Sequence, residues 1–149
     1  MSVKSSSADE TFTLGKRLAP LFKKGSVAAL KGPLGAGKTC LTKGIASGLG
    51  VTEALSSPTY TIVSEYEAVV RGEKITVYHI DAFRLKGDDD FSAIGGEEII
   101  FGEGISIIEW SERISNFIPE GALKIDLDIT GDNKRHIRVY KDESEYSGS

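Results

Sequence analysis

Hydrophobic residues occur at helical spacing in two segments and as one continuous run between them, and these patterns predict the first two helices and the first strand. A capping-box pattern, Ser7 followed by Glu10, precedes a stripe of apolar residues at helical spacing, and Gly25 ends it. Residues 27–30 are all apolar, as in a buried strand. A second apolar stripe predicts a helix that ends before Gly50. The two stripes consist of Leu14, Leu18, Leu21 and Phe22, and of Leu41, Ile45 and Leu49.

Two later segments, residues 59–66 and 75–80, are rich in β-branched and aromatic side chains and predict strands. The connection between them is short, with a turn around Arg71 and Gly72. Because so short a connection cannot hold a crossover helix, we expect the two strands to be antiparallel neighbours. The central sheet is therefore expected to be mixed.

The remaining segments alternate between short helices and strands. Their patterns predict a broken helix over residues 85–101, a buried strand over 105–108, a short helix over 111–118, and a C-terminal hairpin of strands 123–129 and 136–140. Both ends of the chain, residues 1–7 and 143–149, are polar and serine-rich, and we expect them to be disordered.

Composition places these elements in one globular domain. The chain has 149 residues, of which 40% are hydrophobic and 27% are charged. Its net charge of −4 argues against a protein that binds nucleic acid without a partner, because such binding needs a basic face. The chain has a single cysteine, Cys40, and no long apolar run or signal-peptide core, so we expect a cytoplasmic protein that does not enter membranes.

A phosphate-binding loop is the strongest chemical signal. Residues 32–39 read G-x-x-x-x-G-K-T, between the predicted first strand and second helix. The glycines let backbone N–H groups turn inward around an anion, Lys38 places a charge at the β- and γ-phosphates, and the Thr39 hydroxyl ligates Mg²⁺. The helix that follows points its N-terminus at the phosphates. The sequence therefore predicts a P-loop NTPase-like α/β fold of three layers, with a mixed central sheet and a C-terminal β-hairpin.

Two carboxylates follow predicted strands where such a site needs them. Asp81 follows the strand over residues 75–80, and Glu109 follows the strand over 105–108. Ligands and catalytic groups in α/β sheets gather at the carboxyl ends of strands. We predict that Asp81 helps to hold Mg²⁺, and that Glu109 either orients the attacking water or completes the metal shell. The alternative for each is an exposed strand-end acid with no catalytic role.

Several other polar or aromatic residues allow two interpretations. Ser57, Thr59 and Thr61 suit a switch-like segment that senses the γ-phosphate, although ordinary strand-favouring residues would look the same. His79 forms no metal-ligand pair with His136, the only other histidine, and we expect both to be structural. Trp110 is interpreted as a packing residue that could also line the site.

Three classes of phosphate-loop protein compete. A GTPase would offer Asn-Lys-x-Asp, but the only Asn-Lys pair, at 133–134, is followed by Arg135 and His136. A small-molecule kinase usually has an arginine-bearing lid, whereas the middle insertion here is short and acidic. The third class is a switch ATPase, whose turnover drives a partner. A nucleotide-sensing scaffold without turnover is a further alternative.

Four sequence blocks, which occur in a fixed order, favour one of these classes. They are the phosphate loop at 32–39, S-P-T-Y-T at 57–61, H-I-D-A-F-R-L at 79–85, and I-E-W-S-E at 108–112. Together they resemble the bacterial TsaE (YjeE) family, the small ATPases of tRNA threonylcarbamoyladenosine synthesis. The resemblance extends from about Thr11 to Val139, and the second and fourth blocks are much more specific than a bare phosphate loop.

The resemblance implies a role for each matching residue. ATP phosphates would be held by the loop residues Leu34, Gly35, Ala36, Gly37, Lys38 and Thr39. Thr39, Asp81 and Glu109 would lie at Mg²⁺, and catalysis would depend on Lys38, Asp81 and Glu109. Thr11 and Arg135 match nucleotide contacts away from the phosphates, and residues 57–61 match the switch-like segment. Pro33 replaces a frequent aspartate, and Ala82-Phe83 replaces the more usual Leu-Tyr.

The resemblance also implies partners. Such a protein would be a weak ATPase alone and would dock on the TsaD–TsaB pair, which transfers a threonylcarbamoyl group to the adenosine beside the tRNA anticodon. Hydrolysis would reset the complex between cycles, and tRNA would be contacted only through the partners. The chain itself is expected to be a monomer.

Overall fold

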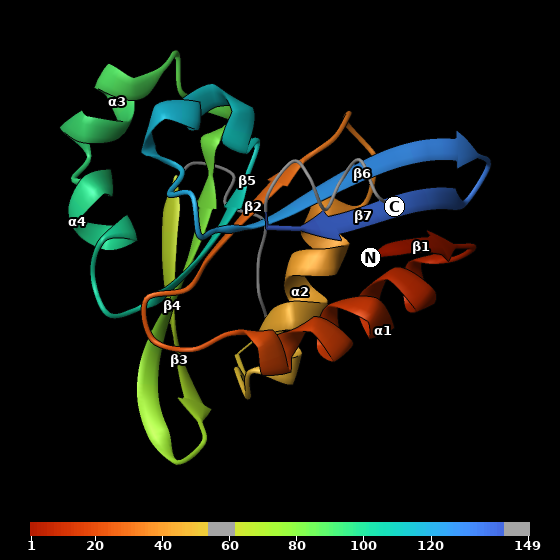
Figure 1. The fold of residues 1–149 in the computed structure, drawn as a ribbon, viewed down its shortest axis with the longest axis horizontal. Coiled ribbons are helices and arrows are strands. Elements are labelled where there is room, and N and C mark those ends of the chain that lie inside the picture. The colour runs from red at the N-terminus through yellow and green to blue at the C-terminus, as the bar shows by residue number, and fades with distance from the viewer. Residues whose placement is uncertain (54–61, 142–149) are drawn as a thin grey trace.

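A seven-stranded sheet forms the middle of the molecule (Figure 1). The computed structural model describes residues 1–53 and 62–141, so the predicted switch residues Ser57, Thr59 and Thr61 and residues 143–149 lie outside the described part. The strands are β1 (Ser2–Ser5), β2 (Val27–Lys31), β3 (Val63–Val70), β4 (Glu73–Asp81), β5 (Ile105–Glu109), β6 (Leu123–Gly131) and β7 (Lys134–Tyr140).

The strand order is β1-β7-β6-β2-β5-β4-β3. The four central strands, from β6 to β4, are parallel, whereas β3 and β4, β6 and β7, and β1 and β7 pair antiparallel. The predicted mixed sheet and C-terminal hairpin are confirmed. Because β2, β5 and β4 are parallel neighbours, the segments that follow them begin at one common edge of the sheet.

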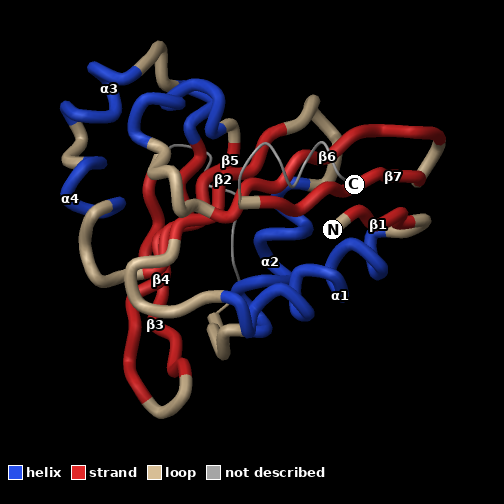
Figure 2. Tube along the Cα trace, in the orientation of Figure 1, coloured by secondary structure: helices blue, strands red, loops and turns tan. Residues whose placement is uncertain are grey.

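Helices cover both faces of this sheet, which confirms the three-layer prediction (Figure 2). They are α1 (Ala8–Leu18), η1 (Ala19–Leu21), α2 (Lys38–Gly48), η2 (Ala82–Arg84), α3 (Asp88–Ala93), α4 (Gly96–Ile100) and η3 (Ser111–Phe117). Alternate residues of β5 enter different cores: Ile107 packs with α1 and α2, and Ile108 packs with α3, α4 and η3. The predicted break within residues 85–101 is confirmed as the interval between α3 and α4.

The expectation of disorder at residues 1–7 is wrong. Residues Ser2–Ser5 form the edge strand β1, with Val3 opposite Ile137 of β7. The N-terminal ammonium of Met1 also donates to the carbonyl oxygen of Val139, at 2.9 Å. A four-residue edge strand is ordered by backbone pairing, so the pattern of its polar side chains does not predict a strand.

The first apolar stripe is also shorter than predicted. Helix α1 ends at Leu18, and Pro20 lies in the single 3₁₀ turn η1 that follows. As a result Leu21 is 59% exposed, whereas Phe22 is fully buried in the core. Among the described residues, no helix is both long enough and apolar enough to cross a lipid bilayer.

Helices α1 and α2 touch backbone to backbone, and this contact fixes α2 behind the phosphate loop. A Cβ added to Gly44 would lie 2.1 Å from the carbonyl oxygen of Phe12, so no larger residue fits. We expect Gly44→Ala to lower the free energy of unfolding by about 1–3 kcal/mol, because the helices must separate. Thermal unfolding followed by circular dichroism measures this, with Gly121→Ala as control, since nothing lies within 4 Å of its added Cβ. Equal melting temperatures for the two variants would contradict the prediction.

Candidate functional site

The phosphate loop connects β2 directly to α2, as the sequence predicts. Two of its glycines occupy the left-handed region of backbone conformation, Gly35 with φ 82° and Gly37 with φ 99°. Gly37 is also the N-cap of α2, so the loop lies against the free N–H groups of that helix. This is the geometry in which a helix N-terminus binds an anion.

The Lys38 side chain folds back across the loop. Its Nζ donates to the carbonyl oxygens of Gly32, at 2.5 Å, and Pro33, at 3.0 Å. It also lies 3.9 Å from the centroid of the Trp110 ring. Burial lowers the pKa of Lys38, and three nearby carboxylates oppose that shift. These carboxylates are those of Glu109, Glu112 and Asp81.

The two predicted strand-end carboxylates lie side by side. Asp81 of β4 and Glu109 of β5 are direct neighbours in the parallel register. With Lys38 and Thr39 they line an open pocket of about 340 Å³. The other described residues that line it are Leu34, Gly35, Gly37, Cys40, Phe83 and Trp110. The structure thus brings together all of the residues predicted to be catalytic or metal-binding.

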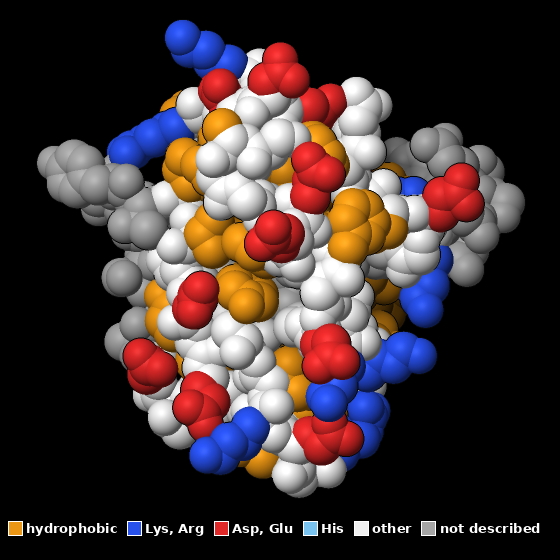
Figure 3. All heavy atoms as spheres, turned by 90° about the vertical axis from the view of Figure 1, so that its left-hand side faces the viewer, with side chains coloured by type: hydrophobic (Ala, Val, Ile, Leu, Met, Phe, Trp, Pro, Cys, Tyr) orange, Lys and Arg blue, Asp and Glu red, His pale blue; other side chains and the backbone are white. Residues whose placement is uncertain are grey.

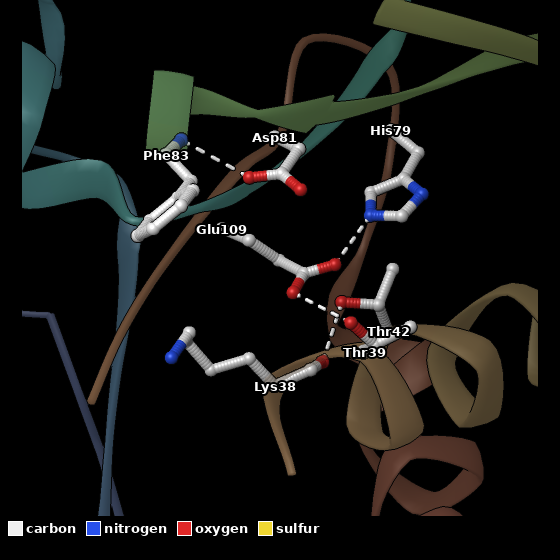
Figure 4. Close-up of polar contacts among 7 residues, drawn as sticks. All are labelled: Lys38, Thr39, Thr42, His79, Asp81, Phe83 and Glu109. Atoms are coloured by element: carbon white, nitrogen blue, oxygen red, sulfur yellow. Dashed lines mark hydrogen bonds and ion pairs between the residues drawn. The ribbon is translucent and has the colours of Figure 1, made fainter. Parts of the chain in front are cut away.

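Glu109 is held at both carboxylate oxygens (Figure 4). Its Oε1 accepts a hydrogen bond from Thr39 Oγ1 at 2.8 Å, and its Oε2 accepts one from His79 Nε2 at 2.5 Å. Only 4% of Glu109 is exposed, so the alternative of a solvated strand-end acid is wrong for this residue.

Asp81 has a turn role in addition to its place in the pocket. Its Oδ1 accepts a hydrogen bond from the backbone N–H of Phe83 at 3.0 Å and so caps η2. Figure 4 shows its carboxylate near that of Glu109. The structural and the functional interpretations of Asp81 are therefore compatible.

Two aromatic rings close one side of the pocket. Trp110 has a left-handed backbone, with φ 59°, and its ring centroid lies 4.9 Å from that of Phe83. Trp110 thus lines the site rather than only packing beneath it. At Phe83, where the resemblance leads us to expect a tyrosine, the ring is retained without the hydroxyl.

The pocket residues fit Mg²⁺. No group of three or more His, Cys, Asp or Glu side chains able to hold a metal occurs in residues 1–53 and 62–141. Mg²⁺ at a phosphate loop does not need one, because it takes one or two protein oxygens together with phosphate oxygens and water. The Thr39 hydroxyl and the carboxylates of Asp81 and Glu109 supply oxygen donors of the required kind.

Thr11 and Arg135 lie beside the loop but do not line the pocket. Thr11 is buried behind Gly37, and its hydroxyl is 2.7 Å from that of Ser5. Arg135 Nη2 donates to the carbonyl oxygen of Gly35 at 3.0 Å and ties β7 to the loop. Their predicted contacts with nucleotide stay predictions.

His79 is the site residue that the sequence reasoning missed. Its burial, with 1% exposed, agrees with the structural role expected of it, but the sequence did not predict its direct contact with Glu109. The available signal was its position two residues before Asp81 on the same strand, since alternate residues share a face.

Comparison with known proteins agrees with this geometry. The family model described as "Threonylcarbamoyl adenosine biosynthesis protein TsaE" matches residues 5–137. The tRNA threonylcarbamoyladenosine biosynthesis protein TsaE of Treponema pallidum is 41% identical over 135 residues, which cover 91% of this chain and 96% of that protein. The Bacillus subtilis protein of the same name is 39% identical over 129 residues, covering 87% and 78%. The crystal structure of Bacillus subtilis YdiB aligns with a TM-score of 0.76 at 32% identity, over 99% of this chain and 89% of that one.

Proposed function

The chain belongs to the TsaE family of threonylcarbamoyl adenosine biosynthesis proteins, and we propose that it serves this tRNA modification as a Mg²⁺-dependent ATPase. Family membership confirms the resemblance drawn from the four sequence blocks. One observation carries the proposed ATPase activity: Lys38, Thr39, Asp81 and Glu109 meet in one pocket on a G-x-x-x-x-G-K-T loop.

Each of these residues has a distinct task in the proposed reaction. Lys38 would exchange its two neutral carbonyl partners for the β- and γ-phosphates, which are stronger acceptors. Thr39, Asp81 and Glu109 would hold Mg²⁺, which when bound neutralises the charge that develops on the phosphates. Glu109 would also orient the attacking water, because its carboxylate is fixed beside the loop.

The partners follow from the family. We propose that ATP binding docks the protein on the TsaD–TsaB pair and that hydrolysis resets the complex. The face in Figure 3, on the α3 and α4 side of the molecule, supports a protein partner rather than direct tRNA contact. Helices α3 and α4 have acidic residues in their first turns, and the residues that follow them, Ile94 and Phe101, are exposed apolar side chains. Figure 3 shows acidic and apolar side chains interspersed on this side. Such a mixture repels phosphate and suits a protein surface.

Steady-state ATP hydrolysis tests the proposal, first with the protein alone and then with the TsaD–TsaB pair added. We expect slow turnover alone and a steep rise with the partners, because docking completes the groups that position water. An ATP hydrolysis rate that does not change when the partners are added would contradict the docking proposal. A phosphorylated metabolite would identify a kinase instead, and stable ATP in the full complex would identify a scaffold.

A further inference from the structure

His79 lies where the core of the domain meets the candidate site. Ile75, Val77, His79 and Asp81 occupy one face of β4, since alternate residues of a strand share a face. Ile75 and Val77 pack into the core with α1 and α2, whereas Asp81 lines the pocket. His79 stands between them and is 1% exposed. It is therefore screened from water yet adjacent to the pocket.

The buried imidazole contacts Glu109. Its Nε2 donates to Glu109 Oε2 at 2.5 Å, as Figure 4 shows, while its Nδ1 is buried and has no hydrogen-bond partner among residues 1–53 and 62–141. An unpaired buried polar atom is costly, and an apolar side chain such as that of Val77 would fill the position without that cost. Packing alone therefore does not account for a histidine here, whereas the contact with Glu109 does.

Glu109 is restrained from two directions. The Thr39 hydroxyl holds Oε1 and the His79 imidazole holds Oε2, so the carboxylate cannot rotate without breaking a hydrogen bond. Thr39 belongs to the phosphate loop and His79 to the sheet, so the pair ties Glu109 to both elements. Groups that fix a metal-binding or catalytic carboxylate in this way act without touching the substrate.

We propose that His79 is a positioning residue that sets the orientation of Glu109 toward Thr39, Mg²⁺ and the attacking water. The proposal rests on the ATPase function proposed above. His79 does not line the pocket, so it acts only through Glu109.

Two nearly isosteric variants test the role. His79→Met removes the donor to Glu109 and keeps most of the volume, whereas His79→Gln places an amide N–H donor close to the position of Nε2. We expect His79→Met to lower kcat about 10–100-fold while the Kd for ATP without metal stays near that of the wild type. We expect His79→Gln to recover most of the lost rate. A wild-type kcat in His79→Met, or equal losses in both variants, would overturn the proposal.

A second readout does not depend on turnover. Trp110 is the only tryptophan of the chain and lies against Lys38, so its fluorescence can report nucleotide binding. The gain in ATP affinity on adding Mg²⁺ should be strong in the wild type and in His79→Gln, and much weaker in His79→Met. Equal gains in all three proteins would overturn the proposal. A wild type without hydrolysis would refute the ATPase function, and this binding measurement would still decide the role of His79.

Discussion

Replacing Lys38 with alanine is expected to abolish detectable ATP binding, with an affinity at least about 100-fold below that of the wild type. Hydrogen bonds to charged groups contribute about 1.5–3 kcal/mol each, and Lys38 is expected to make them to two phosphates. A loss of about 2.7 kcal/mol already corresponds to 100-fold. The side chain is held at the loop, with only 5% of the residue exposed, and a neutral water molecule in its place would not offset the charge of the phosphates.

Calorimetric or fluorescence titration with Mg²⁺-ATP measures the effect, and Lys31→Ala is the matched control. Lys31 is exposed and immediately precedes the loop, so its loss removes one positive charge nearby without touching the proposed phosphate contacts. We expect the control to bind within about threefold of wild type, since exposed charges are screened. Lys38 also holds the carbonyls of Gly32 and Pro33, so thermal unfolding must show that the variant is folded. Equal affinity of folded Lys38→Ala and wild type would refute the phosphate role.

The helices and strands, the phosphate loop and the two strand-end carboxylates could be predicted because they depend on local sequence. The loop residues 32–39 specify their own turn, and a strand before and a helix after them follow from apolar periodicity. Asp81 and Glu109 were found because each ends a predicted strand, and parallel strands end at one edge. That they are direct neighbours depends on β4 pairing with β5, which no local pattern specifies.

The parts that sequence reasoning missed depend on contacts between distant segments. The strand β1 exists because its backbone pairs with β7, at positions 130 to 136 residues away in the chain. The hydrogen bond from His79 to Glu109 likewise joins residues 30 positions apart on neighbouring strands. A histidine alone on a strand is equally consistent with packing and with function. Only the register of the sheet distinguishes the two.

Replacing Glu109 with alanine is expected to leave the binding of ATP without metal largely intact and to remove hydrolysis. The phosphates would still be held by Lys38 and the loop amides, none of which needs the carboxylate. A group that positions water or accepts its proton typically contributes about 10²–10⁴-fold to the rate. Single-turnover hydrolysis and a parallel binding titration separate the two effects.

Alanine at this position also leaves His79 and Thr39 without their shared acceptor, and burial of an unpaired polar group can destabilise the fold. Glu109→Gln is therefore the sharper variant, because its amide oxygen can still accept one of these hydrogen bonds while the negative charge is lost. The matched control is Glu112→Gln, which removes an exposed carboxylate that also acts on Lys38 but does not line the pocket. We expect the control to hydrolyse ATP at nearly the wild-type rate. If Glu109→Gln is folded, binds ATP and turns it over undiminished, then another group must orient the water, and Asp81 is the remaining carboxylate among the described residues that line the pocket.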